Sequence, residues 1–364
     1  MHLIFWQNIL SIHQAPLISE LASRFRVTII AQEEISESRR SAGWRAPDMG
    51  SAEVIVAPNE LKIKDIVNNN RCATHIFTGI KAFPMVYRAF RLAVRCECHI
   101  MVQMEPYENS GWKSIFRSLR YKWLKYKYEK HICAILATGS SGYRCYSKIG
   151  FPSSKVFEWG YFTKKQVLAC TSQRKNDIFN ILFVGRLDNN KQVVSLIREV
   201  INIKRYDVSL TIIGAGPLAQ EIKAWVEQLE NVHYVGSVPN DDIPTYMNQS
   251  DLLVLPSLYD GWGAVVNEAL TCGTRVLCSS ACGASCLLDG TDRGSVFSWE
   301  QTGSLQQHLV RWVSLGPISS ENREKLAAWA NHHISAKSAA NYLISIVHYT
   351  KNKKKMDKPQ APWI

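Results

Sequence analysis

The feature that most constrains the fold is an alternation of short apolar runs with amphipathic stretches, which begins at residue 3 and recurs along the chain. The apolar runs have the length of buried strands, and the stretches between them place apolar residues at helical spacing. This alternation is typical of a parallel sheet with helices on both faces. In the first half of the chain, the expected strands cover residues 3–6, 27–31, 54–57, 75–78, 99–104 and 133–137.

The alternation pauses in a polar stretch at residues 163–177 and then starts again. A chain of 364 residues is long enough for two domains of ordinary size. The sequence therefore predicts an α/β fold of two Rossmann-like, doubly wound parallel-sheet domains that face each other across a cleft. In the second half, the expected strands cover residues 181–184, 209–213, 232–235, 252–255 and 275–278.

The same pattern gives the domain boundaries. We expect an N-terminal domain at residues 1–165 and a C-terminal domain at residues 178–334. A helix at residues 335–350 would pack back on the N-terminal domain. The lysine-rich tail at residues 351–364 is expected to be disordered.

The net charge of +12 predicts an anionic partner, such as a membrane surface, a phosphorylated substrate or a nucleic acid. No recognised nucleic-acid-binding motif is present, so no nucleic acid is expected. The ten cysteines include no C-x-x-C pair, which favours free thiols over metal ligands and a reducing compartment, the cytoplasm. No signal peptide is expected, and no apolar run approaches the ~20 residues of a membrane helix.

Three strand–helix junctions in the second half carry residues suited to a ligand. The first holds Gly185, Arg186 and Lys191, which combine backbone amides, a guanidinium and an ammonium group. Such a set suits a diphosphate, although two solvated cations on a surface loop are the alternative. The second holds Gly214 and Gly216. This segment lacks the third glycine of a dinucleotide-binding fingerprint, so a tight structural turn is favoured over a ligand site when the segment is considered alone.

The third junction is the most informative. Asp260 lies on the loop, and Glu268 follows eight residues later within the next helix. Gly261 and Gly263 allow the backbone and the helix N-terminus to approach a ligand closely. Two carboxylates at this spacing can accept hydrogen bonds from two hydroxyl-bearing parts of one ligand.

Together, residues 180–297 resemble the retaining glycosyltransferases of family four, which have the GT-B architecture. The resemblance rests on an ordered set of segments. They are Gly185-Arg186-Leu187 with Lys191, Gly214-Ala215-Gly216-Pro217, Val235-Gly236-Ser237-Val238-Pro239, Leu253-Val254-Leu255-Pro256-Ser257 and Asp260 with Glu268-Ala269-Leu270 and Cys272-Gly273.

The resemblance implies a role for each matching residue. Arg186 and Lys191 would neutralise the diphosphate of a UDP- or GDP-sugar, and Glu268 would bind the ribose. Asp260, which stands where the family usually has Glu, would contact the transferred sugar. The residues assigned to donor binding are Gly185, Arg186, Lys191, Gly214, Gly216, Val238, Gly261, Trp262, Gly263, Ala264 and Glu268.

The chemistry is expected to proceed without a metal ion, because no D-x-D site accompanies the third junction. Arg186, Lys191 and the amides that follow Trp262 would supply the positive charge. Glu105, after an expected strand of the first domain, is the candidate on the acceptor side. The catalytic set is therefore Arg186, Lys191, Asp260 and Glu105.

The segment from Trp112 to His131 has an apolar stripe formed by Trp112, Phe116, Leu119, Trp123 and Tyr126, flanked by basic residues. A basic, aromatic-rich helix of this kind suits an anionic membrane surface. A helix packed in the core with a solvated basic face is the alternative.

The function expected from these observations is transfer of a sugar from a nucleotide donor to a lipid-linked or membrane-proximal saccharide. This would take place at the inner face of the cytoplasmic membrane, in bacterial surface polysaccharide synthesis (capsule, O-antigen or exopolysaccharide). Two alternatives remain at this point: a nucleotide-sugar epimerase of the same architecture, and a non-catalytic protein that binds sugar nucleotides or nucleic acid.

Overall fold

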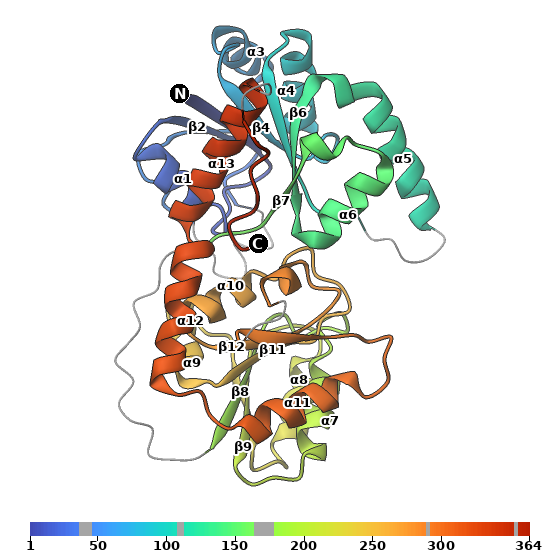
Figure 1. Cartoon of the computed structure of the whole chain (residues 1–364), viewed down its shortest axis with the longest axis vertical. Helices are drawn as coiled ribbons and strands as arrows, with labels where there is room; N and C mark the ends of the chain where they lie inside the picture. Colours follow the sequence, from blue (N-terminus) through green and yellow to red (C-terminus); the bar gives the residue numbers. More distant parts are fainter. Residues whose placement is uncertain (36–45, 108–112, 164–177, 289–291, 353–355) are drawn as a thin grey trace. The chain divides into compact units, whose positions relative to one another are not determined.

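The computed structural model describes residues 1–35, 46–107, 113–163, 178–288, 292–352 and 356–364 (Figure 1). The chain forms two compact units. Met1–Lys164 and Ser335–Ile364 form the N-terminal unit, and Lys165–Ile334 form the C-terminal unit. Each unit is an α/β domain built on a parallel sheet, which confirms the fold class predicted from the strand–helix alternation.

The N-terminal unit has a seven-stranded sheet in the order β3-β2-β1-β4-β5-β6-β7. The strands are β1(His2–Gln7), β2(Arg26–Ala31), β3(Glu53–Val56), β4(Thr74–Thr78), β5(His99–Met104), β6(Ile132–Thr138) and β7(Val156–Trp159). The strand order reverses between β1 and β4, which pair in parallel from Leu3 and Thr74 onward. The carboxyl ends of these two strands therefore form the topological switch point of the unit.

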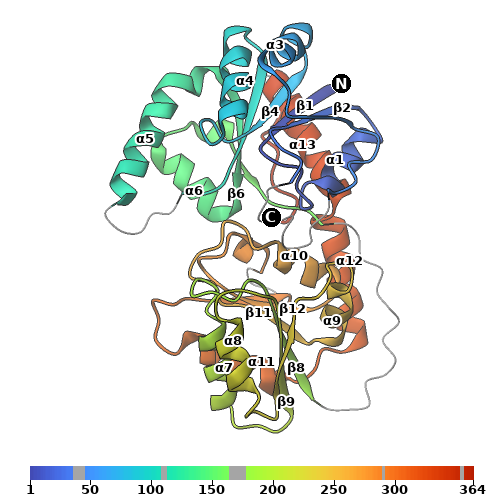
Figure 2. The same cartoon turned by 180° about the vertical axis from the view of Figure 1, so that it is seen from behind.

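Helices cover both faces of this sheet (Figures 1 and 2). They are α1(Ala15–Ala22), α3(Glu60–Asn69), α4(Pro84–Arg95), α5(Lys113–Tyr128), α6(Gly139–Ile149) and α13(Ala336–Lys351). Helices α3 to α6 bury their apolar residues in one core with the sheet, whereas α1 and α13 pack against each other. The covered sheet explains why the central strands are almost continuously apolar.

The C-terminal unit repeats this design with a six-stranded sheet in the order β10-β9-β8-β11-β12-β13. The strands are β8(Phe179–Val184), β9(Val208–Ile213), β10(Val232–Gly236), β11(Leu252–Leu255), β12(Arg275–Ser279) and β13(Gly294–Phe297). The helices are α7(Val193–Asn202), α8(Ala219–Val226), α9(Ile243–Gln249), α10(Ala264–Thr271), α11(Ser304–Leu315) and α12(Ser320–His333). Its switch point lies between β8 and β11.

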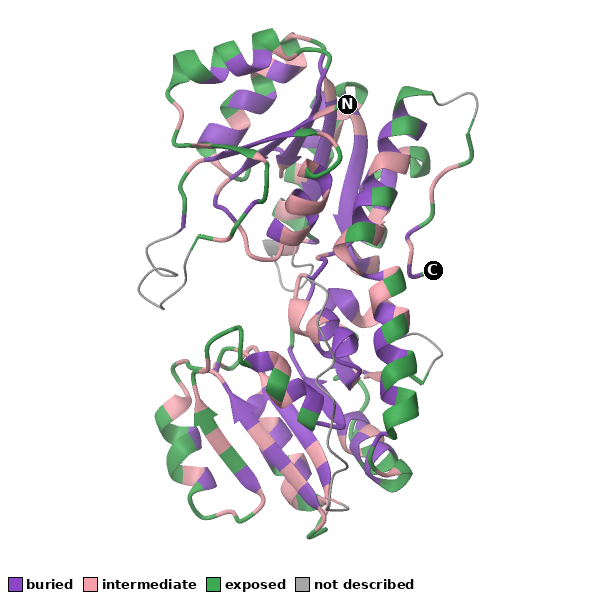
Figure 3. Cartoon of the chain, turned by 90° about the vertical axis from the view of Figure 1, so that its left-hand side faces the viewer, coloured by how far each residue is buried: buried purple, intermediate pink, exposed green. Residues whose placement is uncertain are grey.

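Burial follows these layers within each unit (Figure 3). All four residues of β11 are buried, whereas β10, at a sheet edge, alternates between buried and more exposed positions. The helices bury one side, as Leu196, Ile197 and Val200 of α7 do. Among the residues that the structure describes, no helix combines the length and apolarity needed to cross a bilayer.

The end of the chain differs from the sequence prediction of a disordered tail at residues 351–364. Lys351 ends α13, and residues 356–364 pack on the N-terminal unit. The Lys358 ammonium donates to the carbonyl oxygens of Ser153 and Val156, at 2.7 and 2.8 Å. Trp363 is 7% exposed and lies beside Phe162. An anchored lysine and a buried indole order a segment whose composition alone indicated disorder.

Candidate active site

The loops that follow β8 and β11 are joined at the switch point of the C-terminal unit. Asn190 makes the connection with both its backbone and its side chain. Its carbonyl accepts from the Leu258 amide at 2.8 Å, and its carboxamide exchanges hydrogen bonds with the backbone of Tyr259 at 2.9 and 3.1 Å. The sequence analysis did not single out Asn190, because an asparagine in a polar loop has no distinguishing spacing.

Lys191 and Asp260 meet across these joined loops. The Lys191 Nζ atom lies 2.5 Å from Asp260 Oδ2, and the two side chains are 20% and 17% exposed. The backbone of Asp260 is fixed in turn, since its amide donates to Ala281 and its carbonyl accepts from the Gly283 amide. A partly desolvated ion pair therefore lies at the carboxyl edge of the sheet.

Arg186 has another partner. Its side chain is 70% exposed, and its Nε atom lies 3.3 Å from Asp188 Oδ2. The other oxygen of Asp188 accepts from the Lys191 backbone amide at 3.1 Å. The structure thus brings Lys191 to Asp260, as members of one predicted site, but places the Arg186 guanidinium beside Asp188 on the surface of the loop.

Helix α10 begins next to this ion pair. Gly263 caps it with φ of 91°, a left-handed conformation that favours glycine. A Cβ atom there would lie 2.7 Å from Cys282 Sγ and 2.8 Å from Leu255 Cδ2. Within the described part of the chain, the amides of Ala264 and Val265 have no hydrogen-bond acceptor. The helix therefore offers free first-turn amides for an anion.

Ligand contact by the backbone of Trp262 stays a prediction, and the side chain of this residue has a structural role. Its side chain is 1% exposed, and its indole Nε1 donates to Asn267 Oδ1 at 2.7 Å. Its carbonyl accepts from the Ala284 amide at 2.8 Å. The Trp262 ring therefore braces the loop from inside, because a large apolar ring is more stable in the core than at a polar loop surface.

Glu268 is half-buried in the second turn of α10. Desolvation raises the pKa of its carboxyl group to about 7. The carboxyl oxygens make no hydrogen bond to any residue that the structure describes. An unpaired acid in this setting is suited to accept hydrogen bonds from ligand hydroxyl groups, which would stabilise its charged form.

The glycines of the second junction hold two loops together. A Cβ on Gly214 would lie 1.8 Å from the Gly185 oxygen, and one on Gly216 would lie 2.3 Å from the Leu187 oxygen. These contacts support the tight-turn interpretation, while direct ligand contact by Gly185, Gly214 and Gly216 stays a prediction. Gly261 and Val238, also predicted to bind the donor, are half-buried on the loops that follow β11 and β10.

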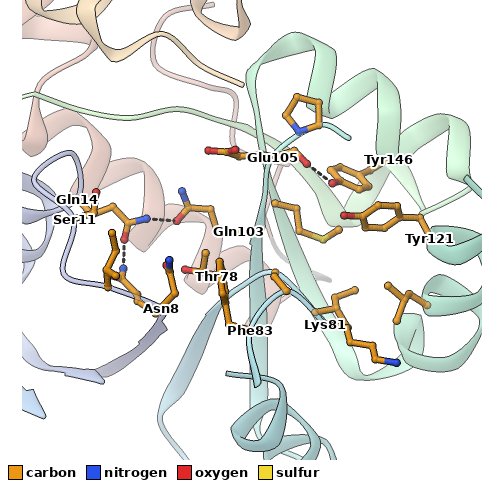
Figure 4. A pocket seen from close by; sticks show the side chains of 18 of the residues that line it. Asn8, Ser11, Gln14, Thr78, Lys81, Phe83, Gln103, Glu105, Tyr121 and Tyr146 are labelled. Carbon is orange, nitrogen blue, oxygen red and sulfur yellow. Dashed lines mark hydrogen bonds between the residues drawn. The ribbon is translucent and has the colours of Figure 1, made fainter. Parts of the chain in front are cut away.

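A cavity of about 390 Å³ occupies the switch point of the N-terminal unit (Figure 4). It lies at the carboxyl ends of β1, β4 and β5, and Glu105 is exposed on its wall. The Glu105 carboxylate accepts a hydrogen bond from the Tyr161 hydroxyl, and its backbone carbonyl accepts one from Tyr146. Glu105 is thus placed in a cavity, as its position after a strand suggested.

The cavity also contains a chain of three buried carboxamides that the sequence analysis missed. Gln7 donates to Gln14, and Gln14 Nε2 donates to Gln103 Oε1 at 3.0 Å. The three residues come from β1, the start of α1 and β5, so no local spacing connects them.

Among the described residues, no cluster of three or more histidine, cysteine or acidic side chains could hold a metal ion.

Comparisons with known proteins show which family the C-terminal unit resembles. Residues 171–333 match the family model described as glycosyl transferases group 1. The chain is 29% identical to an N-acetylgalactosamine-N,N'-diacetylbacillosaminyl-diphospho-undecaprenol 4-alpha-N-acetylgalactosaminyltransferase of Campylobacter jejuni, over 45% of this chain and 46% of that protein. It is 26% identical to the O-antigen biosynthesis glycosyltransferase WbnH of Escherichia coli, over 63% of this chain and 64% of that protein. The matched segments thus span less than two thirds of either relative.

The fold extends the similarity to nearly the whole chain. The crystal structure of Anabaena HepE in complex with UDP aligns with a TM-score of 0.71 and 12% identity, and covers 96% of this chain and 100% of that one. The two parallel-sheet units therefore define the class of GT-B glycosyltransferase folds. Within that class, residues 171–333 are similar to the glycosyl transferases group 1 family.

Proposed function

We propose that the protein is a retaining glycosyltransferase that moves a sugar from a nucleotide-sugar donor to a saccharide acceptor during surface polysaccharide assembly. The observation that carries the proposal is the meeting of Lys191, Asp260 and the first turn of α10 at one switch point. The names of the Campylobacter and Escherichia relatives support a lipid-linked or O-antigen acceptor. The UDP bound to HepE supports a UDP-sugar as the donor.

Each group at this edge has a role in the proposed reaction. The amides of Ala264 and Val265, together with Lys191, would bind the diphosphate and stabilise it as the bond to the anomeric carbon breaks. Glu268 would accept hydrogen bonds from the ribose hydroxyls, and Asp260 would contact the sugar. The Arg186 side chain is exposed and long enough to rotate away from Asp188. Its guanidinium would then add a second positive charge at the diphosphate.

The same residues lead us to propose that the donor is bound without a metal ion. Lys191, Arg186 and the helix N-terminus supply the positive charge that a divalent cation supplies in other enzymes. Release of UDP from a panel of UDP-sugars, measured with Mg²⁺ and with EDTA, tests this proposal. Activity that disappears in EDTA and returns with Mg²⁺ would contradict it.

The catalytic assignment is tested with Lys191→Ala. Removal of one such donor typically lowers turnover by about 10²–10³-fold, and we expect a loss of this size in UDP release. Lys223→Ala, which removes an exposed lysine of α8 in the same unit, is the matched control and should keep wild-type activity. A loss of only a few-fold in both Lys191→Ala and Arg186→Ala would overturn the catalytic assignment. An epimerised nucleotide sugar as the sole product would contradict the proposed transferase activity and indicate an epimerase.

The acceptor is proposed to lie at an anionic membrane on its cytoplasmic side. Five apolar side chains of α5 are 48–88% exposed, namely those of Ile115, Phe116, Leu119, Trp123 and Tyr126. Basic residues accompany them, and Lys127 lies over the Trp123 ring at 5.0 Å. Trp112, the first residue of the predicted stripe, lies outside the described residues. An exposed apolar stripe with cationic flanks favours a bilayer surface over a protein core.

Vesicle sedimentation tests this membrane contact. We expect the protein to bind vesicles of phosphatidylcholine with phosphatidylglycerol, to bind pure phosphatidylcholine much less, and to dissociate at high salt. The double variant Phe116→Ser/Trp123→Ser should reduce binding to the anionic vesicles. Leu61→Ser, at a 69% exposed position of α3, is the control. Equal binding to both vesicle types would refute the membrane proposal.

A further inference from the structure

The two side chains proposed to hold the diphosphate and the sugar of the donor lie on different loops of the C-terminal unit. Lys191 follows β8, Asp260 follows β11, and 69 residues separate them in the chain. In the proposed reaction, the bond that breaks joins the sugar to the diphosphate, so both loops must hold one donor at the same time. The distance between the two loops therefore sets the geometry of catalysis.

Each of these residues is held on its own side by backbone hydrogen bonds. The Lys191 amide donates to the carbonyl oxygen of Asp188 at 3.2 Å and to its Oδ1 atom at 3.1 Å. The Asp260 amide donates to the Ala281 carbonyl at 3.1 Å, and the Asp260 carbonyl accepts from the Gly283 amide at 3.0 Å. These bonds fix Lys191 within the β8 loop and Asp260 against the loop that follows β12. They do not join the β8 loop to the β11 loop.

The side chain of Asn190 supplies this connection. Its Nδ2 atom donates to the Tyr259 carbonyl at 2.9 Å, and its Oδ1 atom accepts from the Tyr259 amide at 3.1 Å. The carboxamide thus exchanges two hydrogen bonds with one residue, as opposed residues of two antiparallel strands do. Asn190 directly precedes Lys191, and Tyr259 directly precedes Asp260. The paired groups therefore lie one residue from the ion pair on both loops.

The ion pair of Lys191 with Asp260 also joins the loops, with its charged atoms 2.5 Å apart, but a bound donor competes for it. The diphosphate attracts the Lys191 ammonium, and the sugar hydroxyl groups donate to the Asp260 carboxylate. The hydrogen bonds of Asn190 do not involve either charged group, so they persist when the donor is bound. Asn190 is therefore suited to keep the two loops in register during the reaction.

From this arrangement we infer that Asn190 is a positioning residue of the proposed transferase. Its carboxamide holds the loop that contacts the sugar at a fixed distance from the loop that binds the diphosphate. The inference rests on the proposed function and adds to it a residue that touches neither part of the donor. Loss of the carboxamide should therefore impair turnover of the whole donor rather than binding of its nucleotide part.

The variant Asn190→Ala tests this role. We expect kcat for UDP release from a UDP-sugar to fall at least tenfold, because a displacement of about 1 Å can lower turnover roughly 10²-fold. The Kd of UDP, measured by calorimetry, should change less than twofold, since UDP has no sugar and Lys191 stays bound to Asp188. Thermal unfolding should change little, because Tyr259 is 38% exposed and water can replace the lost hydrogen bonds.

Asn189→Ala is the matched control, since it removes the same side chain at the adjacent, exposed position. The Asn189 carboxamide makes no hydrogen bond to the residues that the structure describes, so kcat should change less than twofold. A loss below tenfold in Asn190→Ala, or a UDP affinity that falls as much as kcat, overturns the inference. The variant Asp260→Glu gives a further readout, because glutamate is longer by one methylene and can span a wider gap. Asn190→Ala should cost at least threefold less kcat in that background, and an equal loss in both backgrounds overturns the positioning role.

Hydrogen exchange separates this inference from the proposed function, because it does not depend on activity. The amides of Leu258 and Tyr259 donate to Asn190 and should be protected in the wild type and in Asn189→Ala. In Asn190→Ala, the Tyr259 amide should exchange at least tenfold faster. Unchanged protection of Tyr259 overturns the inference, even where UDP is released normally. A wild-type protein that releases UDP from no UDP-sugar contradicts the proposed function instead, and the exchange rates still decide whether Asn190 joins the two loops.

Discussion

His75 shows how far burial determines the chemistry of one side chain. It is fully buried, with its ring stacked near those of Trp6 and Phe77. Its Nδ1 accepts from the Trp6 indole at 3.1 Å, and its Nε2 lies 3.0 Å from the Asn70 carbonyl oxygen. This set of partners requires the neutral form, and desolvation lowers the pKa of His75 to about 4.

The lowered pKa predicts acid-sensitive folding. In the unfolded chain, His75 binds a proton below pH 6.5, while in the folded chain it does so only near pH 4. Its contribution to stability is therefore complete above pH 6.5 and is lost as the pH falls toward 4, by up to about 3 kcal/mol. Urea denaturation at pH 7.5 and pH 5 measures this loss. His75→Phe should reduce the difference between the two pH values, and an identical difference in both proteins would contradict the assignment.

Glu268 gives a second pH prediction, which depends on the proposed function. Ribose hydroxyl groups that donate to its carboxylate would lower the pKa from about 7, so donor binding should weaken as the pH falls from 8 to 6. We expect a loss of affinity of up to about tenfold. A UDP-sugar is the appropriate ligand, because its diphosphate does not titrate in this range. Glu268→Gln should bind more weakly and without this pH dependence, so a pH profile equal to that of the wild type would exclude the role.

Contacts between individual site residues were predictable only where the residues lie close together in sequence. Asp260 and Glu268 stood out because a loop and the next helix bring them together within one local pattern. The contact of Lys191 with Asp260 depends on two loops 69 residues apart, and the hydrogen bond of Gln14 with Gln103 spans 89 residues. Such contacts depend on sheet order, which no local spacing encodes.

At the level of elements, the apolar runs located the central strands well. The run at residues 252–255 corresponds to β11(Leu252–Leu255), and the run at residues 99–104 to β5(His99–Met104). The strands that the pattern missed are β7(Val156–Trp159) and β13(Gly294–Phe297), which form the edges of their sheets. Glu158 interrupts β7, and Gly294 and Ser295 begin β13, so the apolar runs of these two four-residue strands are too short to recognise.

The conformation of Gly263 at the start of α10 allows us to predict how adding one methyl group there changes stability. Gly263→Ala should destabilise the C-terminal unit by about 1–3 kcal/mol and impair UDP binding, because the left-handed φ and the contacts with Cys282 and Leu255 oppose a side chain. Gly303 caps α11 with φ of 73° and has open space around it. Gly303→Ala is therefore the control for backbone strain alone, and thermal unfolding compares the two. A smaller loss for Gly263→Ala than for Gly303→Ala would contradict the packing argument.

At the level of the whole molecule, the N-terminal unit is made from two separate pieces of the chain. Residues 1–164 supply its sheet, and residues 335–364 supply α13 and the packed C-terminal segment. The sequence pattern identified the final helix from its spacing, but the order of residues 356–364 comes from tertiary contacts. Lys358 reaches backbone carbonyl groups more than 200 residues earlier in the chain.

This arrangement predicts that the last residues stabilise the first ones. Trp363→Ala should lower the stability of the N-terminal unit by about 2–4 kcal/mol, because it removes a buried indole next to Phe162 and Tyr342. Hydrogen exchange should show faster exchange in β7 and α13 and unchanged exchange in the C-terminal unit. Ile364→Ala, at a 74% exposed position, is the control. Equal protection in both variants would indicate that the segment is dispensable.

The divided N-terminal unit has a consequence for synthesis on the ribosome. The C-terminal unit is one uninterrupted stretch, so it can fold as soon as residue 334 has emerged. The N-terminal unit cannot be completed until residues 335–364 have also been made, and until then the face of α1 that packs against α13 is uncovered. A chain that lacks residues 335–364 would therefore contain a folded C-terminal unit and an incompletely folded N-terminal unit. The exposed apolar face of that N-terminal unit would be recognised by chaperones and proteases.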